Sequence, residues 1–570
     1  MIHKSALFVV TILSLLTSCA QPSTPKTDTK ADLLLLNGVF FTADSLHPSA
    51  TAVAVAGDRI LAVGSDAEMR LLANEKTEVI DLQGAFAMPG FIEGHGHFEA
   101  LGTSLINLNL MATKSWQEIV QLVAEKAKSV PPGEWIEGRG WHQEKWNIAP
   151  DRTVSGYPYN DLLSAAAPGH PVVLYHASGH GLIANAKAME IAGISAETPD
   201  PVGGRIVRDA GGRAIGIFEE NAMNLIDTPF ANWNNTRAEA ERIAEYDTIV
   251  AIASRECLRR GITSFQDAGS NWWELEQFER LAKGHNIPIR LWAMIAQPKI
   301  SDLGKLKDFP KSDIGDDHFT SRAVKAYFDG ALGSYGAWLL APYSDKPDSY
   351  GQNTTPIDTI AAIAAACRDQ QLQFCVHAIG DRGNREVLNV FEKAGSKNGW
   401  RWRVEHAQHI DPADQPRFKQ LGVIASMQAI HCTSDAPFVV KRLGVERART
   451  GAYAWRNLID SGAKLANGTD TPVEDVNPLP CIYASVTRIF NPEQPAFFPE
   501  QCMTRDEALL SYTLWNAYAA FEENKKGVLK VGMLADITVF DTDLLRCMPE
   551  KIKTAKVLKT IVGGKILYEN

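Results

Sequence analysis

Two histidines separated by one residue, His95 and His97, are the first side chains of this sequence that could bind a metal ion. They end a mostly apolar segment that begins at Phe86. On a β-strand, residues two positions apart point to the same face, so both imidazoles can reach one cation. Isolated pairs of this kind also arise by chance among exposed or hydrogen-bonded histidines, so the interpretation depends on further ligands nearby.

Three later apolar runs also end in residues that can ligate a metal. These residues are His377, His406 and Asp470. In parallel β/α barrels the carboxyl ends of the strands meet at one mouth, where active sites lie. Residues at several strand ends therefore converge. The sequence predicts a site for at least one metal ion, formed by these three side chains together with His95 and His97.

Lys325 lies in the apolar segment 323–328 and is a less obvious ligand. A lysine ammonium group carries three donors and no acceptor, so it cannot bind a cation directly. Carbamylation by carbon dioxide would give it two anionic oxygens that bridge two metal ions. The residue types alone leave this modification open.

The segments that must position these residues alternate between short apolar runs and helix-length amphipathic stretches, which predicts parallel β/α units and an α/β fold. Residues 32–85 and 524–570 instead contain short strand-like runs divided by turns, and we expect the two ends to form one small composite β-sandwich domain. Residues 86–523 would then form a barrel. Residues of about 99–255 are too many for a single β/α loop, so we expect an inserted, lid-like subdomain after the first barrel strand.

The amino-terminal residues are predicted to direct export. Residues 1–18 have a short basic start and an apolar run of about eleven residues, which is too short to span a bilayer and is typical of a cleaved signal peptide. The residues up to Cys19 resemble a bacterial lipoprotein signal, although an ordinary signal peptide with an incidental cysteine is the alternative. We expect lipidation of Cys19, a solvated tether over residues 19–31, and an exported lipoprotein of the cell envelope, facing the periplasm or the outer surface. Membrane contact would occur only through this anchor.

Composition restricts the partners of the chain. Its formal net charge is −10, without a block of lysine and arginine residues, so nucleic acid is not an expected partner. Apolar residues make up 45% of the sequence, the proportion of an ordinary globular protein. Of the eight cysteines, the seven after Cys19 have no repeated spacing, which gives no support for a disulfide framework. The expected partner is a small amide-like molecule, and homo-oligomerisation is left open.

The ordered set of a His-x-His pair, a strand lysine, two further histidines and an aspartate resembles that of the amidohydrolase superfamily. More narrowly, the sequence is similar to the amidohydrolase 3 branch, which includes the N-substituted formamide deformylase-like metal-dependent hydrolases. Segments that carry this closer resemblance are Gly-Arg-Gly-Trp at 138–141, Gly-His-Gly-Leu at 179–182 and Phe-Asp-Gly-Ala at 328–331. The resemblance implies a TIM-like (β/α)8 barrel with a discontinuous β-sandwich. It also implies one or two divalent metal ions, zinc first among them, and hydrolysis of a carbon–nitrogen bond.

The resemblance further implies a role for each ligand. His95, His97 and Asp470 would bind the first ion. Carbamylated Lys325 would bridge to a second ion held by the two remaining histidines of the set. Asp470 is the expected catalytic base and acid, because it can take a proton from a metal-activated water and return it to the leaving nitrogen.

Three further residues are candidates for substrate contact. His180 is similar to a histidine that reaches the substrate or its oxyanion, which would make it catalytic, and a structural histidine is the alternative. Trp141 either walls an apolar or aromatic substrate pocket or packs inside the insertion. Asp329 either contacts the substrate, orients the site or caps a turn. His142 and His431 are weaker candidates.

Other functions stay open from the sequence alone. The same scaffold would serve a dipeptidase, or an aryl-amide or N-acyl amino acid hydrolase, because no cationic pattern decides for or against a free substrate carboxylate. A catalytically inactive binding lipoprotein would keep the fold without the chemistry. The complete set of ligand-type residues argues against that last alternative.

Overall fold

A computed structural model describes residues 29–570 of the chain. The predicted signal peptide, Cys19 and most of the predicted tether lie outside the described residues, so the expectations for them stay predictions. Within residues 29–570, the structure contains no helix that is both long and apolar enough to cross a membrane.

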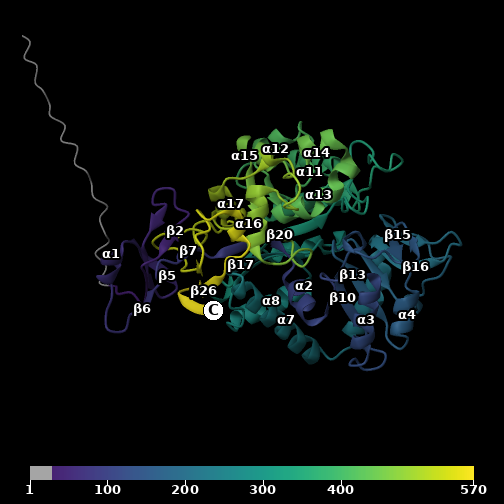
Figure 1. Cartoon of the computed structure of the whole chain (residues 1–570), viewed down its shortest axis with the longest axis horizontal. Coiled ribbons are helices and arrows are strands. Elements are labelled where there is room, and N and C mark those ends of the chain that lie inside the picture. Colours follow the sequence, from purple (N-terminus) through teal and green to yellow (C-terminus); the bar gives the residue numbers. More distant parts are fainter. Residues whose placement is uncertain (1–28) are drawn as a thin grey trace, which may run out of the picture.

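Eight parallel strands at the centre of the molecule form one sheet that curls into an almost closed barrel (Figure 1). In order, they are β8 (Phe91–Gly96), β17 (Ile262–Ser270), β18 (Arg290–Ile295), β20 (Phe319–Tyr327), β21 (Gln373–Ala378), β22 (Arg403–His406), β23 (Ile424–Met427) and β24 (Lys464–Asn467). Most of their residues are buried, as in parallel sheets whose faces are covered. A short strand, β19 (Lys311–Asp313), pairs antiparallel with β20. The predicted α/β barrel fold is confirmed.

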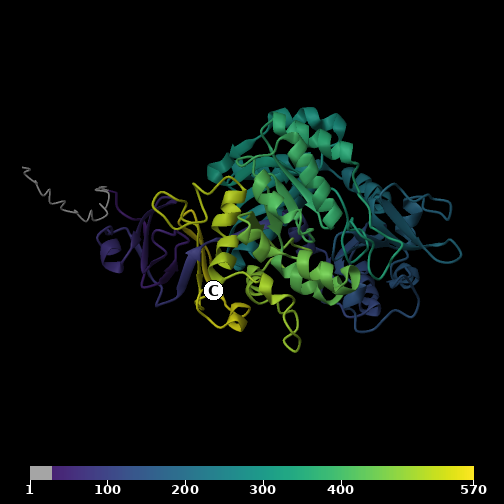
Figure 2. The same ribbon diagram turned by 90° about the horizontal axis from the view of Figure 1, so that it is seen from above.

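Helices cover the outside of the barrel (Figure 2). The main ones are α7 (Glu239–Arg259), α8 (Trp272–Lys283), α10 (Ile357–Asp369), α11 (Asp381–Ala394), α12 (Gln415–Leu421), α13 (Ala429–Leu443), α16 (Pro478–Thr487) and α18 (Leu514–Ala519). Helix α11 illustrates the cause. Its Val387, Leu388 and Phe391 are buried against the barrel at helical spacing, so one apolar face fixes the helix in place.

The seam between the first and last barrel strands is closed by a side chain. Asn516 Nδ2 donates to the carbonyl oxygens of Ile92 on β8 and Asn467 on β24, both at 2.7 Å, and its Oδ1 accepts from the Asn467 N–H at 3.0 Å. Just beyond the seam, the Asp470 N–H donates to the His95 carbonyl oxygen at 2.7 Å. The strand ends that carry these two predicted ligands are therefore held side by side.

The two ends of the described chain form a pair of small sheets at one end of the molecule (Figure 1). One sheet contains β5 (Arg59–Gly64), β4 (Ala52–Ala56), β1 (Leu33–Leu36) and β6 (Glu78–Asp81). The other contains β27 (Lys565–Glu569), β26 (Val557–Val562), β25 (Ile537–Phe540), β7 (Phe86–Pro89), β2 (Val39–Phe41) and β3 (Ser49–Ala50). Antiparallel pairing of β25 with β7 joins the carboxy-terminal strands to the start of the chain. The expected discontinuous β-domain is present, and its exact boundaries stay predictions.

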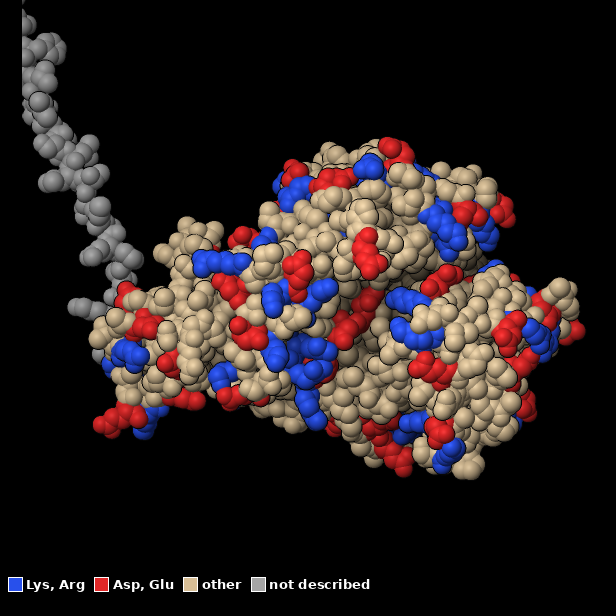
Figure 3. Space-filling view, in the orientation of Figure 1, with Lys and Arg blue, Asp and Glu red and all other residues tan. Residues whose placement is uncertain are grey.

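The insertion lies between β8 and β17, on the side of the barrel away from the small sheets (Figures 1 and 2). Its sheet contains β15 (Gly204–Arg208), β16 (Ala214–Glu220), β14 (Gly181–Ala184), β13 (Val172–His176), β10 (Ile136–Trp141) and β9 (Leu108–Asn109). Apolar residues on the two faces of this sheet form two separate hydrophobic clusters. In the face drawn in Figure 3, a hollow separates the insertion from the barrel, and acidic and basic side chains lie interspersed around it.

Candidate metal centre

His95, His97 and Asp470 form one compact group at the mouth of the barrel. His95 lies on β8, His97 follows the end of this strand, and Asp470 follows β24. Asp470 Oδ1 lies 3.5 Å from His95 Nε2 and 3.3 Å from His97 Nε2. The three ligand atoms all lie within 4.8 Å of one another. The carboxyl ends of the first and last barrel strands, β8 and β24, therefore lie side by side, as expected for a closed β/α barrel.

The polar atoms of this region fit a bound cation. His95 Nε2, His377 Nε2 and Asp470 Oδ1 are buried, and none has a hydrogen-bond partner among the described residues. Buried polar atoms are almost always paired, so unpaired acceptors of this kind need another partner. Imidazole nitrogens and a carboxylate oxygen are ligands that zinc and similar divalent metals accept. The donor set therefore fits a divalent metal ion.

Burial keeps His95, His377 and His406 in the neutral form that can ligate a metal. Burial, with a contribution from the charge of Lys325, lowers the pKa of His95 to about 4, although Glu405 opposes the shift. Burial also lowers the pKa values of His377 and His406 well below the usual range. Neutral rings keep a free nitrogen lone pair at physiological pH.

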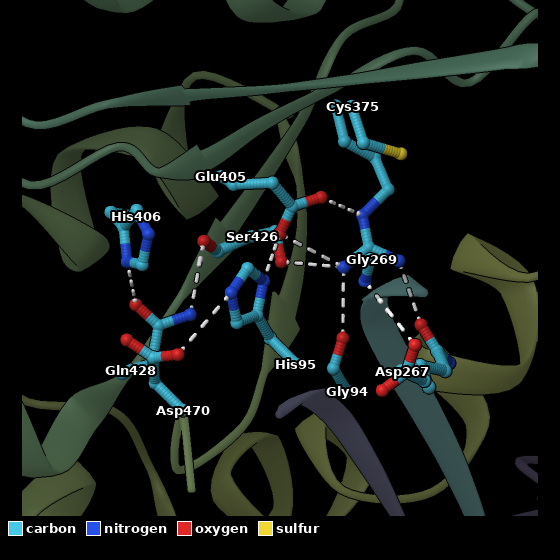
Figure 4. Close-up of polar contacts among 12 residues, drawn as sticks. Gly94, His95, Asp267, Gly269, Cys375, Glu405, His406, Ser426, Gln428 and Asp470 are labelled. Atoms are coloured by element: carbon cyan, nitrogen blue, oxygen red, sulfur yellow. Dashed lines mark hydrogen bonds and ion pairs between the residues drawn. The ribbon is translucent and has the colours of Figure 1, made fainter. Parts of the chain in front are cut away.

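A buried ion pair fixes the orientation of His95. Its Nδ1 contacts Glu405 Oε2 at 2.5 Å, and Glu405 Oε1 lies 2.6 Å from Arg403 Nε. Burial raises the pKa of Glu405, but the charge of Arg403 and the His95 ring outweigh this effect and hold the pKa below its usual range. Figure 4 shows His95 between Glu405 and Asp470. Because Nδ1 is engaged, Nε2 of His95 is left for the metal.

Sequence reasoning missed Glu405, although β22 offered a signal. Arg403 and Glu405 are two residues apart on this strand and point to the same face, so a buried strand that carried both required them to pair. The partner of Glu405, His95, lies 310 residues away in the sequence. The sequence could not identify that contact.

His406 and His377 lie next to each other at the ends of β22 and β21. Their ring centroids are 4.4 Å apart, and His406 Nδ1 contacts Gln428 Oε1 at 2.7 Å (Figure 4). His377 Nε2 lies 3.5 Å from Asp329 Oδ1. Among the described residues, a second compact group contains His406, the weaker candidate His431 and Asp470, whereas His377 belongs to neither group.

Two of the predicted ligands have strained backbones. His406 has φ 71° and Asp470 has φ 58°, both in the left-handed region that residues other than glycine rarely adopt. Such a conformation costs about 1–3 kcal/mol and persists only where surrounding contacts enforce it. His406 is the last residue of β22 and Asp470 lies three residues past β24, so both left-handed residues lie at the carboxyl ends of barrel strands.

Lys325 lies inside the barrel on β20. It is fully buried, its Nζ has no hydrogen-bond partner among the described residues, and this atom lies 4.7 Å from the centroid of the Tyr327 ring. Lys325 borders the same cavity as His97, His377 and Asp470. The structure therefore brings the lysine to the ligand cluster, and its carbamylation stays a prediction.

Two cavities meet at the metal centre. One, of about 100 Å³, lies between the insertion and the barrel and is bordered by Trp141 and the apolar Leu332 and Phe438. The other, of about 590 Å³, is more polar and is bordered by Arg139 and several acidic residues. His180, His377, His406 and Asp470 border both cavities. A substrate in either cavity would reach the same reactive atoms.

His180 belongs to the insertion and lies where the two cavities meet. The His180 ring centroid lies 5.3 Å from that of His377, and Nδ1 lies 2.9 Å from Glu220 Oε2. Burial lowers the pKa of His180, but the charge and hydrogen bond of Glu220 outweigh this effect, so the net shift is upward. The predicted substrate-facing histidine is therefore next to the predicted metal ligands. Glu220 was missed because it pairs with a residue 40 positions away.

The other two predicted substrate contacts are placed differently. Trp141 is buried, and its Nε1 donates to the Leu174 carbonyl oxygen at 2.8 Å while its ring borders the smaller cavity, so it both packs the insertion and walls a pocket. Asp329 accepts backbone N–H groups of Trp338, Ile379 and Gly380 at 2.8–2.9 Å. Burial raises its pKa to about 7, although these donors oppose the shift. Its contacts favour the orienting role among the alternatives for Asp329.

Comparisons with known proteins agree with this geometry. The sequence model of the amidohydrolase family (Amidohydro_3) matches residues 78–568. Protein LONG AFTER FAR-RED 3 of Arabidopsis thaliana is 32% identical, over 96% of this chain and 93% of that protein. The N-substituted formamide deformylase of Arthrobacter pascens is 26% identical, over 94% of this chain and 98% of that protein. The crystal structure of an uncharacterized metal-dependent hydrolase from Pyrococcus horikoshii has a TM-score of 0.74 and 25% identity, over 91% of this chain and 99% of that one.

Proposed function

This chain belongs to the amidohydrolase family, a family of metal-dependent hydrolases that act on carbon–nitrogen bonds, and we propose that it hydrolyses an amide-like bond of a small molecule. The observation that carries this proposal is the set of buried, unpaired ligand atoms of His95 and Asp470 at the junction of two cavities. A purely structural role for these residues would require hydrogen-bond partners that the described residues do not provide.

The ligands would hold a divalent metal, for which zinc is our first expectation. When bound, such an ion would lower the pKa of a bound water to about 7 and polarise a substrate carbonyl. Asp470 Oδ1 lies beside the ligand nitrogens of His95 and His97, where it can accept the proton of the attacking water. The same oxygen can then return this proton to the leaving nitrogen, because amines leave poorly as anions.

His180 would act on the substrate oxygen. Because Glu220 engages Nδ1, the Nε2 atom of His180 is the one left to face the cavities. In its protonated form it would donate a hydrogen bond to the negative charge that develops on the carbonyl oxygen. The insertion would in this way complete a site whose metal ligands all come from the barrel.

Lys325 supports a second ion in this proposal. An ammonium group buried without a partner is costly, whereas a carbamate removes the positive charge and provides two oxygens for metal ions. Whether the enzyme holds one ion or two follows from the metal content of the purified protein.

The substrate class we propose first is N-substituted formamides, since the Arthrobacter pascens relative is named for them. The apolar wall formed by Trp141, Leu332 and Phe438 supports a substrate with an apolar or aromatic substituent. Dipeptides, aryl amides and N-acyl amino acids are the alternatives that one substrate panel would separate from formamides.

The test combines metal analysis with hydrolysis assays. Purified protein supplemented with zinc or manganese should retain at least one ion per chain and hydrolyse a member of the panel. A content below about 0.2 ion per chain, with no hydrolysis, would favour the binding lipoprotein instead. Stripping the metal with a chelator should abolish activity, and adding the metal back should restore it.

A further inference from the structure

The Gly-Arg-Gly-Trp segment at 138–141 ends strand β10 of the insertion and carries a cation, Arg139, that has no role so far. The register of β10 with β13 shifts between Arg139 and Trp141, which marks a β-bulge at Gly140. Gly140 has φ 109°, and a methyl group there would come within 2.8 Å of the Met111 backbone nitrogen. The bulge therefore requires a glycine between the arginine and the tryptophan.

This bulge accompanies a division of the two side chains between two cavities. On a regular strand, residues two positions apart would point to the same face. Here Trp141 borders the smaller cavity, whereas Arg139 borders the larger, more polar one. A methyl group at Gly179 would come within 3.2 Å of Arg139 Nη2, so the guanidinium lies beside the residue that precedes His180. The motif therefore offers an aromatic ring to one cavity and a cation to the other.

The protein itself uses few of the donors of this half-buried guanidinium. An arginine carries five N–H donors. Arg139 Nη2 donates to the Ala177 carbonyl oxygen at 3.3 Å, and the buried Nε has no hydrogen-bond partner among residues 29–570. Within the same part of the chain, Arg139 forms no ion pair. A cation withdrawn from water without a counterion is costly, so the arrangement calls for an anionic partner.

Two glutamates whose charges act on Arg139 are engaged elsewhere. Glu137 accepts from Asn107 Nδ2 at 2.8 Å, and Glu99 accepts from Thr103 Oγ1 at 2.6 Å. Burial raises the pKa of Glu137 to about 8, with a contribution from the charge of Glu99, and burial also raises the pKa of Glu99. A carboxyl with a pKa of about 8 is mostly uncharged at neutral pH. Glu137 therefore leaves the positive charge of Arg139 available to a ligand.

The larger cavity would attract an anion only if its own acids are satisfied. Asp329 accepts its three backbone N–H groups, and Asp267 accepts from the Phe98 N–H at 2.8 Å and from Ser270 Oγ at 2.7 Å. Arg139 and Lys325 are the arginine and lysine residues that border this cavity in the described part of the chain. If Lys325 is carbamylated, Arg139 is the permanent cation that remains there.

We propose that Arg139 binds a carboxylate of the substrate in the larger cavity while an apolar substituent occupies the smaller one. The inference rests on the proposed hydrolysis of an amide-like bond and narrows its substrate to N-formyl or N-acyl derivatives of apolar amino acids. In these molecules the carboxylate and the apolar side chain branch from the carbon next to the amide nitrogen. They can therefore enter two cavities that meet beside His180 and Asp470. A planar guanidinium matches a carboxylate with two parallel N–H donors.

The test compares two amides that differ only in the carboxylate, N-formylleucine in both enantiomers and N-isopentylformamide, as substrates of metal-loaded, full-length protein. Wild-type kcat/KM should favour the better enantiomer of N-formylleucine by at least about tenfold, the factor that a hydrogen bond to a charged group provides. Arg139→Met should lower this ratio at least about tenfold. The loss should lie mainly in a higher KM for N-formylleucine, because the carboxylate is bound equally before and during the reaction.

Two further variants separate recognition from structure. Arg139→Lys keeps the charge but not the paired donors, so its ratio should lie between those of wild type and Arg139→Met. The matched control is Arg208→Met, which should keep the wild-type ratio. Arg208 lies half-buried on β15 of the same sheet, pairs with Asp200 at 2.8 Å and borders neither cavity.

Two outcomes would overturn this inference and leave the proposed function standing. One is a wild-type protein that hydrolyses N-isopentylformamide as well as N-formylleucine, a result that needs no variant to fold. The other is an Arg139→Met protein in which turnover of both amides falls alike, because Arg139 would then only support the structure of the insertion. If the metal-loaded wild-type protein hydrolyses neither amide nor any dipeptide, aryl amide or other N-acyl amino acid, the proposed function itself is overturned.

Discussion

Replacing Glu220 with glutamine tests whether the insertion sets the pKa of His180 beside the candidate metal centre. Glu220 Oε2 lies 2.9 Å from His180 Nδ1, and this carboxylate raises the pKa of His180 even though burial opposes the shift. Glutamine keeps the shape and an acceptor oxygen but removes the charge. The protonated form of His180 should therefore become less stable, and its pKa should fall.

The magnitude follows from the strength of the hydrogen bond. A bond to a charged group contributes about 1.5–3 kcal/mol, and a neutral bond about 0.5–1.5 kcal/mol. The difference of about 1 kcal/mol is somewhat less than one pKa unit, since one unit equals about 1.4 kcal/mol. If protonated His180 stabilises the oxyanion, activity is lost as pH rises through its pKa. The basic limb of the kcat/KM profile should then move to lower pH by about half a unit to one unit.

The assay measures kcat/KM against pH for metal-loaded protein, with metal content determined for each sample. Glu219→Gln is the matched control, because this adjacent carboxylate pairs with Arg205 at 2.6 Å instead of with His180. The control should leave the basic limb in place, and both variants should keep the wild-type metal content. A basic limb that does not move in Glu220→Gln would refute the reasoning, whatever the change in maximum rate.

Three further predictions concern other parts of the chain. Asp470→Asn, assayed with the metal loaded, should lower kcat by about 10²–10⁴-fold, and wild-type turnover at full metal content would exclude its role in proton transfer. Arg290 donates from Nε and Nη2 to the buried Asp536 at 2.7 and 3.0 Å. Arg290→Met leaves this carboxylate buried without a partner and should lower the free energy of unfolding by about 3–5 kcal/mol. Urea unfolding measures this change, and a loss below about 1 kcal/mol would contradict the prediction. Burial raises the pKa of Asp536, but the charge and hydrogen bonds of Arg290 outweigh this effect, so the net shift is downward. The stabilisation that this pair provides is therefore complete above the pKa of the aspartate in the unfolded chain, and it is lost as the pH falls through the pKa in the folded protein. The urea midpoint of wild type should therefore fall more steeply at acid pH than that of the variant. Cys19→Ala should shift the protein from the membrane to the soluble fraction of bacterial cells, and continued membrane association would contradict the proposed lipid anchor.

The convergence of the candidate ligands at strand ends could be predicted from the sequence, because the barrel itself brings these ends together. His95, His377, His406 and Asp470 each follow an apolar run, and parallel strands need no knowledge of distant contacts to bring their ends together. His431 was only a weaker candidate from the sequence, because it lies in the first turn of the helix after β23 and not at a strand end.

Contacts that orient the ligands could not be predicted, because each pairs residues from separate elements. Glu405 with His95, Gln428 with His406 and Glu220 with His180 all depend on the register of folded strands. Residue type gave a hint only for Glu405, whose charge inside a buried strand required a partner. Asn516, which closes the barrel seam, gave no hint at all, since an asparagine in a short helix is ordinary in any sequence.

The contact between the insertion and the barrel is tight beside Glu220, the partner of His180. A methyl group at Gly330 or Gly336 would come within 2.3 or 2.7 Å of Glu220 Oε1, so the absence of a side chain at these barrel-loop positions leaves room for the carboxylate that orients His180. The predicted metal ligands all belong to the barrel, whereas His180 and Glu220 belong to an insertion with hydrophobic clusters of its own. A change in the insertion can therefore alter the substrate or the pH response without moving a metal ligand. A change at a barrel strand end would instead alter metal binding first.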